Sequence, residues 1–173
     1  ALFTQSGGNV TLSNTGANEN YGNFDLESGR QLILSSSTLN NTGTFNLNGA
    51  VISGTGTLVN SGGGTIAGRG TISSNFNNDG GVLLVENGTT NVTKAFSNSG
   101  LIQLTSATAN LTGGAITNTG SIEGRGNVGN NIANSGIIEA IGGTLTLGGT
   151  VNNNTGGLMT ASTGNKLLVT KGM

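Results

Sequence analysis

The chain has 173 residues, the length of one ordinary domain, but 33 of them are glycine and only 8% are charged. A net charge of −1 gives no electrostatic basis for binding nucleic acid, so we expect no nucleic-acid partner. Because histidine and cysteine are absent, catalytic triads and zinc sites built on those residues are excluded. No apolar run approaches the ~20 residues that span a bilayer, and we expect no membrane insertion.

An Asn-x-Gly triplet recurs along the chain about every 19 residues. A repeat this short cannot bury a core alone and must stack on its neighbours, which predicts a solenoid. Low charge could also indicate disorder, but a disordered chain would not hold its apolar residues at regular positions. The triplets start at Asn20, Asn41, Asn60, Asn78, Asn98, Asn118, Asn134 and Asn154.

Apolar residues recur at three places in each repeat, here taken in chain order. Six to ten residues before the Asn lie Val10, Leu12, Leu34, Ile52, Ile72, Val92, Leu111, Val128, Leu145 and Leu147. Two residues before it lie Leu39, Leu58, Phe76, Phe96, Ile116 and Ile132, with Asn18 and Asn152 as exceptions. Four residues after it lie Phe24, Phe45, Val82, Ile102, Ile122, Ile138 and Leu158, and Ile66 follows two extra glycines. Six residues after it, Leu26, Leu47, Leu84 and Leu104 give way to Gly124, Ala140 and Thr160.

These places predict three short strands per repeat, because segments such as Phe24-Asp25-Leu26 alternate with a period of two. We therefore predict an all-β fold, a single-stranded parallel β-helix of about 8–9 coils of ~19 residues, forming one domain over residues 1–173. Glycine and asparagine suit the turns because both tolerate positive φ. Stacked asparagines are expected to bond amide to amide along the axis. Six-residue spacings also fit a left-handed β-helix, but coil lengths of 16 to 21 residues favour a right-handed one.

Three segments carry a resemblance to known proteins. They are residues 52–58, 60–72 and 118–126, which follow a pattern of the form N-x-G-x-I-x-G-x-G-x-I. Such coils resemble the β-helical passengers of autotransporters and the filamentous-haemagglutinin-like exoproteins of bacteria. The resemblance implies an extracellular or cell-surface rod that serves adhesion, biofilm cohesion or the display of another domain. It transfers no catalytic residue to this chain.

One pair of acidic residues has a spacing that suits chemistry. Glu123 and Glu139 both lie five residues after their Asn on adjacent coils, with Gln103 one coil earlier. Their backbones are expected to lie ~4.8 Å apart, near the carboxylate separation of retaining glycosidases. A calcium site would need six to eight oxygens. The alternative is an outward acidic patch partly balanced by Arg125, and we favour it over a cation site or catalysis.

Two further patterns have structural explanations. Gly68-Arg69-Gly70 and Gly124-Arg125-Gly126 lack the spacing and the lysine of a phosphate-binding loop, and tight corners explain them better. The middle residues of the triplets form a hydroxyl column, an arrangement that can bind ice on a flat β-helix face, but a second matching threonine column is missing. Its members are Thr42, Ser61, Ser99, Thr119, Ser135 and Thr155, interrupted by Tyr21 and Asp79.

Neither end of the sequence carries a charged cap: residues 1–3 and 167–169 are apolar. This indicates either a segment of a longer rod or a subunit that stacks head to tail into filaments. We expect a non-enzymatic adhesive or structural rod at a bacterial surface, without cofactor or metal, whose partners are its own copies, neighbouring coils or glycans. The alternatives are a carbohydrate-binding or carbohydrate-cleaving β-helix and, less favoured, an ice-binding one.

Overall fold

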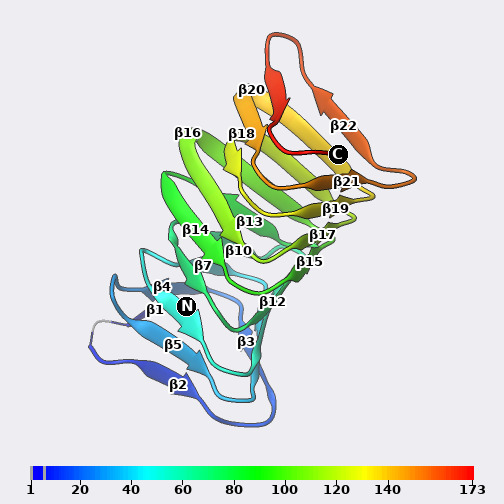
Figure 1. The fold of residues 1–173 in the computed structure, drawn as a ribbon. Helices are drawn as coiled ribbons and strands as arrows, with labels where there is room; N and C mark the ends of the chain where they lie inside the picture. The colour runs from blue at the N-terminus through cyan, green and yellow to red at the C-terminus, as the bar shows by residue number, and fades with distance from the viewer. Residues whose placement is uncertain (1, 6) are drawn as a thin grey trace.

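The computed structural model describes the backbone of residues 2–5 and 7–173 and the side chains of residues 7–173. In this part of the chain there are 23 strands and no helix, as predicted. The chain winds into parallel coils that stack into a rod, with its two ends at opposite ends of the stack (Figure 1). Ala1, the first residue of the apolar start noted above, lies outside the described residues. The right-handed winding stays a prediction.

Each coil contributes strands to three columns, and every pairing between named strands is parallel. The first column contains β1 (Leu2–Gln5), β4 (Asn23–Leu26), β7 (Thr44–Asn46), β10 (Thr65–Ala67), β13 (Val82–Val85) and β22 (Leu158–Ala161). The second contains β2 (Val10–Leu12), β5 (Gln31–Leu34), β8 (Val51–Ser53), β11 (Gly70–Ile72), β14 (Gly88–Val92) and β23 (Lys166–Val169). The third contains β3 (Ala17–Asn20), β6 (Thr38–Asn41), β9 (Thr57–Ser61), β12 (Asn75–Asp79), β15 (Phe96–Asn98), β17 (Ile116–Asn118), β19 (Ile132–Asn134) and β21 (Val151–Asn153).

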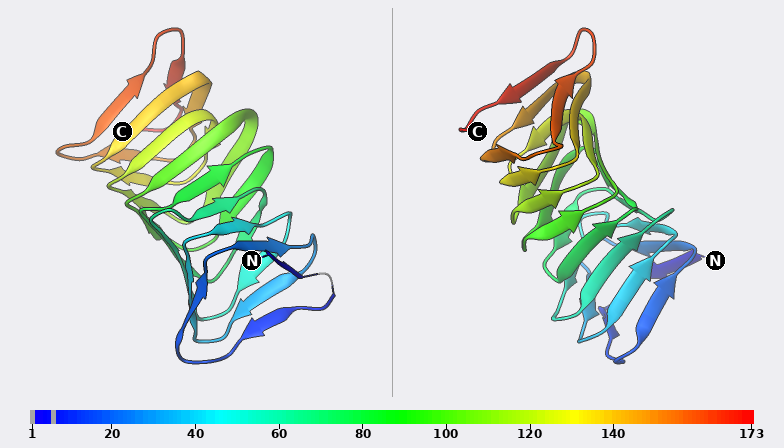
Figure 2. Two further views of the ribbon diagram at one scale, coloured as in Figure 1. Left: turned by 180° about the vertical axis from the view of Figure 1, so that it is seen from behind. Right: turned by 90° about the vertical axis from the view of Figure 1, so that its right-hand side faces the viewer.

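Three long strands join the first two columns. They are β16 (Leu101–Gly113), β18 (Ser121–Val128) and β20 (Ile137–Leu147), which continue from the first column into the second. Within the described residues, the first two columns therefore form one 15-stranded sheet, and the third forms an 8-stranded sheet of its own. The two sheets enclose a core that runs the length of the rod (Figure 2). The prediction of three strands per coil is confirmed.

The core consists of in-register columns of apolar side chains. Ile102, Ile122 and Ile138 are successive members of one column, and each is fully buried. Phe24 stacks on Phe45 in the same column, with ring centroids 4.6 Å apart. Burying one such side chain stabilises the fold by roughly 1.5–3 kcal/mol. Since every member contacts the coils before and after it, the core is continuous rather than divided into units.

A ladder of buried asparagines lies at the corner between the third column and the next coil. In the described chain, each ladder side chain except the last donates its Nδ2–H to the Oδ1 of the asparagine one coil later, over 2.6–2.8 Å. Every Nδ2 that donates along the ladder also donates to a backbone carbonyl of the next coil. The predicted amide ladder is confirmed, and all its bonds point toward the C-terminal end. Its buried members are Asn20, Asn41, Asn60, Asn78, Asn98, Asn118 and Asn134, and the exposed Asn153 is its last acceptor.

The glycines beside the ladder are needed because two coils approach closely there, and not because their φ angles are positive. A Cβ at Gly120 would lie 2.1 Å from the carbonyl oxygen of Gly100, and one at Gly136 would lie 2.1 Å from that of Gly120. These three glycines are not among the described residues with positive φ, and neither is any ladder asparagine. The explanation by positive φ is therefore wrong for this corner. It holds in longer corners, where Gly63 has a φ of 87°.

The register differs from the sequence prediction in the fourth coil. Gly80 and Gly81 lengthen the corner by one residue, so Leu83 aligns with Ile66 and Ile102. Leu83 is fully buried, whereas Val82, which we predicted at this place, is half-buried on the outward side. The same shift places Val85 inside in place of Leu84. Counting from the triplet failed here because it assumes a corner of constant length.

The last coil is shifted in the same way. Asn153, and not Asn154, aligns with Asn134 and receives its ladder bond. The apolar place two residues before it is then Val151, which is fully buried, so Asn152 is no exception to the pattern. The shift carries into β22, where Met159 and Ala161 occupy the inward positions that we predicted for Leu158 and Thr160. At the other end Asn18 does align with Leu39, and that exception is confirmed.

We predict that Gly120→Ala lowers the free energy of unfolding by about 3 kcal/mol, because the new methyl group overlaps backbone of the preceding coil. Gly62→Ala is the matched control: Gly62 lies in the equivalent corner of another coil and has no positive φ, and the added Cβ would lie 3.9 Å from the Gly80 carbonyl oxygen. Urea unfolding followed by circular dichroism measures both. Equal midpoints for the two variants would contradict the close-approach explanation.

Candidate functional site

Only outward side chains and corners can present chemistry to solvent, because the inward positions are filled by the core and the ladder. We consider four such features, namely the acidic pair, the hydroxyl column, the two glycine-arginine corners and a polar hollow on the side of the rod. No helix in the described residues is long and apolar enough to cross a membrane.

The acidic pair lies where the sequence predicted. Glu123 on β18 is in register with Glu139 on β20, and both side chains are half-buried on the outward face. Gln103 on β16 precedes them in the same column and donates its Nε2–H to Glu123 Oε1 over 3.0 Å. Thr160 continues the column on β22. The pair is therefore part of a mixed polar column.

Arg125 does not neutralise this pair as we had expected. Its Nε donates to the carbonyl oxygen of Thr105 over 3.1 Å, and its Nη1 donates to that of Gly142 over 3.0 Å. The guanidinium thus bridges the turns of the coils on either side. Within the described residues neither carboxylate forms an ion pair, and two like charges on adjacent strands are mildly destabilising.

The pair brings together few of the groups that metal binding needs. Among the described residues there is no group of three or more acidic, histidine or cysteine side chains that could hold a metal ion. Calcium takes six to eight oxygens, more than two carboxylates and the amide of Gln103 supply. A glycosidase would also need one of its two carboxyl groups to stay protonated as the general acid.

The hydroxyl column is used within the rod. Thr42 and Thr119 donate their hydroxyls to the carbonyls of Asn20 and Asn98 in the preceding coils, over 3.3 Å in each case. Ser99 donates its hydroxyl to the carboxylate of Asp79 over 3.0 Å. Asp79, which interrupts the column, is thus hydrogen-bonded to one of its members. In the last coil the shifted register gives this place to Asn154 and not to Thr155. The hydroxyls of Thr42 and Thr119 thus bond to the backbone of the preceding coil, and that of Ser99 bonds to a carboxylate.

The glycine-arginine corner at Gly68 is a turn, as predicted, whereas the one at Gly124 lies within the continuous strand β18, at an irregularity of its register. Gly68 has a φ of 92° and Gly70 one of 155°. Gly124 and Gly126 have φ values of 115° and 133° in the bend of β18. An L-residue with a side chain would be strained at each of these positions, which explains the glycines without a ligand.

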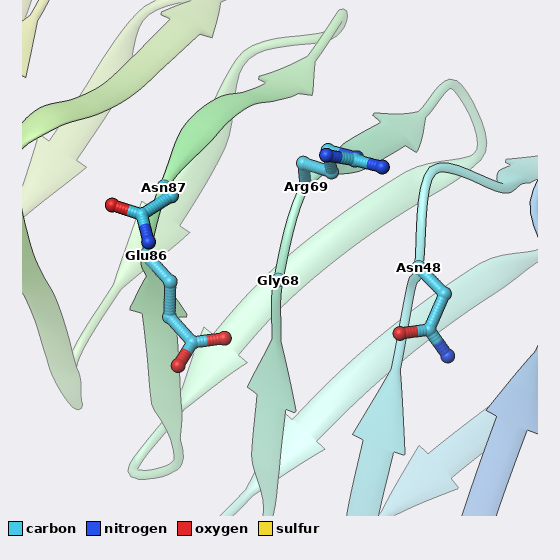
Figure 3. Close-up of a pocket in the computed structure, with 5 residues that line it drawn as sticks. All are labelled: Asn48, Gly68, Arg69, Glu86 and Asn87. Atoms are coloured by element: carbon cyan, nitrogen blue, oxygen red, sulfur yellow. The ribbon is translucent and has the colours of Figure 1, made fainter.

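A polar hollow of about 330 Å³ lies beside the first of these corners. Three successive turns between the first and second columns line it (Figure 3). Figure 3 shows the Glu86 carboxylate and the Asn48 side-chain oxygen directed from opposite sides toward the stretch around Gly68. The lining residues are Asn48, Gly68, Arg69, Glu86 and Asn87.

Sequence reasoning missed this hollow because it needs the relative register of three turns of different length. Asn48 and Arg69 lie two residues beyond the aligned residues Asn46 and Ala67. Asn87 lies three residues beyond Leu84, the residue aligned with Ala67 in the next coil. The sequence did contain one indication of a site in these turns. Its only arginines, Arg30, Arg69 and Arg125, all lie near turns between the first two columns. Only the structure places their neighbours.

Comparisons with protein-family models, with curated proteins and with solved structures found no significant match to the chain. The site must therefore be interpreted from its own geometry.

We predict that Glu139→Gln raises the melting temperature by about 1–2 °C at low salt, because it removes the repulsion from Glu123. The gain should shrink at high salt, since screening weakens that repulsion in the wild type. Glu27→Gln, which removes an equal charge from an exposed turn, is the matched control.

Thermal unfolding of the two variants with and without millimolar calcium measures the effect. A lower melting temperature for Glu139→Gln, together with calcium stabilisation of the wild type alone, would mean that the pair holds a cation.

Proposed function

We propose that this chain is a non-enzymatic structural and adhesive rod of a bacterial cell surface or extracellular matrix. The observation that carries the proposal is the asparagine ladder, which runs through the corner of every coil from Asn20 to Asn153 without interruption. The most regular polar residues of this fold bond to one another from coil to coil. Such a fold suits a structural function, because it keeps a fixed length and shape. The resemblance of its repeats to secreted bacterial surface proteins supports the location.

Open strand edges support stacking on further coils. In the described chain, β22 and β23 each pair on one side only. Leu158 and Ser162 donate their N–H groups to the coil before them, so by alternation those of Met159 and Ala161 face away from the stack. The tail covers part of β21, where the Val151 N–H donates to the Gly172 carbonyl over 3.3 Å.

The opposite end of the described chain offers the complementary edge, formed by β1, β2 and β3. The polarity of the ladder matches this arrangement: Asn153 is its last member and Asn20 its first. We propose that each open edge pairs with a parallel coil, either of the same longer chain or of a second copy. A head-to-tail contact of this kind does not close on itself and produces filaments.

A carbohydrate-cleaving β-helix is the second candidate, because Glu123 and Glu139 do lie on adjacent coils. We therefore propose glycans as adhesive partners of the rod, and glycan cleavage as a less favoured activity. Ice binding is disfavoured, since the hydroxyls of Thr42 and Thr119 donate to backbone carbonyls.

We predict that the purified chain forms head-to-tail oligomers whose length grows with concentration, measured by sedimentation velocity and electron microscopy. Ala161→Pro removes an N–H from the open edge of β22 without removing a bond inside the rod, and should weaken association at least about tenfold. Ala161→Ser keeps the N–H and should associate like the wild type.

Short monodisperse rods at the highest concentration would contradict assembly between copies. The ends would then serve only for stacking within a longer chain.

We also predict that the chain releases no reducing sugars from a panel of plant, bacterial and animal polysaccharides. Release that disappears in Glu139→Gln but persists in Glu27→Gln would contradict the structural function and support cleavage.

A further inference from the structure

The polar hollow beside Gly68 contains both donors and acceptors without partners in the described chain. The Arg69 side chain forms no hydrogen bond or ion pair with any described residue, whereas its backbone carbonyl accepts the Gly49 N–H over 2.7 Å. Its side chain lies between two glycine turns: a Cβ at Gly49 would be 3.7 Å from Arg69 Nε, and one at Gly88 would be 3.6 Å from Arg69 Cδ. The side chain therefore packs beside both turns, and it is exposed to solvent.

The two asparagines of the hollow are held by bonds on their far sides. Asn87 accepts a hydrogen bond from the Thr108 hydroxyl at Oδ1 over 3.1 Å, which leaves its Nδ2–H groups as donors toward the hollow. Asn48 donates its Nδ2–H to the Leu26 carbonyl over 3.0 Å, which leaves its Oδ1 as an acceptor. The orientation of each amide is thereby fixed before any ligand arrives.

Glu86 determines which ligands the hollow can hold. Its carboxylate would repel a phosphate or sulfate that carries two negative charges, while the Arg69 guanidinium would repel a metal cation. The lining has no aromatic or large aliphatic side chain, which disfavours an apolar ligand. A ligand with one negative charge and several hydroxyl groups satisfies both sides of the hollow.

We propose that this hollow binds a uronic acid unit of an acidic polysaccharide. The sugar carboxylate accepts two parallel hydrogen bonds from the Arg69 guanidinium, and the Asn87 Nδ2–H groups donate to other oxygens of the sugar chain. The sugar hydroxyls donate to the Glu86 carboxylate and to Asn48 Oδ1. The site involves only side turns of the rod, so it does not depend on whether the ends assemble.

The test is a titration of the isotope-labelled chain with trigalacturonic acid and with a neutral galactose trisaccharide, at physiological salt, followed by amide NMR shifts. We expect shifts at Asn48, Gly68 and Asn87 with the acidic sugar, and at least about tenfold weaker binding of the neutral one. Arg69→Gln should lose at least about tenfold in affinity for the acidic sugar, with the remaining spectrum unchanged.

Arg30→Gln is the matched control, because it removes an equal charge from a turn between the same two columns outside the hollow. It should bind the acidic sugar like the wild type. If Arg30→Gln and Arg69→Gln lose equal affinity for the acidic sugar, diffuse charge attraction explains the binding and the proposal is overturned. Equal shifts with both sugars, tighter binding of inorganic phosphate, or no shifts at these residues would also overturn it.

Discussion

Every coil of this chain depends on the coils before and after it, because a turn of about 20 residues cannot bury its own apolar side chains. The asparagine ladder shows this dependence most clearly. Each ladder amide from Asn20 to Asn134 is removed from water and finds its acceptor in the next coil, since an unpaired buried amide costs about 1–3 kcal/mol. The ladder therefore fixes the register of the stack, and the apolar columns follow it.

The ladder also gives the rod a direction. All its amide bonds point from the N-terminal toward the C-terminal end, and the glycines beside it allow each corner to rest against the backbone of the preceding coil. Only a coil with a similar corner can continue such a stack. The same interaction that stabilises a single chain is thus the one that would join it to further coils.

The most regular residues are occupied by this scaffold, so distinctive chemistry lies where the repeat is irregular. The turns between the first and second columns differ in length and carry Arg69 and Glu86, whereas every ladder corner begins with a bonded asparagine although its length also varies. The long strands of the later coils bend through the equivalent place, and there Arg125 bonds to backbone carbonyls instead. A smooth scaffold with local differences in its turns can acquire a ligand site without a change in the core.

The sequence was sufficient for the fold because stacking repeats the same demands in every coil. It predicted the ladder, the three strand columns and the alignment of Glu123 with Glu139. It misplaced Val82 and Asn154 because glycine-rich corners vary in length, and a one-residue change in a strand exchanges its inward and outward faces. The hollow could not be predicted, since it depends on turns whose lengths follow no repeat.

The most direct test of this account is hydrogen exchange of the side-chain amides, followed by NMR in deuterated water. The Nδ2 protons of Asn60, Asn78, Asn98 and Asn118 should exchange as slowly as the core backbone, because each is buried and bonded to the next coil. Those of the exposed Asn77 and Asn87 should exchange rapidly. Equally fast exchange at both sets of asparagines would contradict the claim that the ladder holds the stack together.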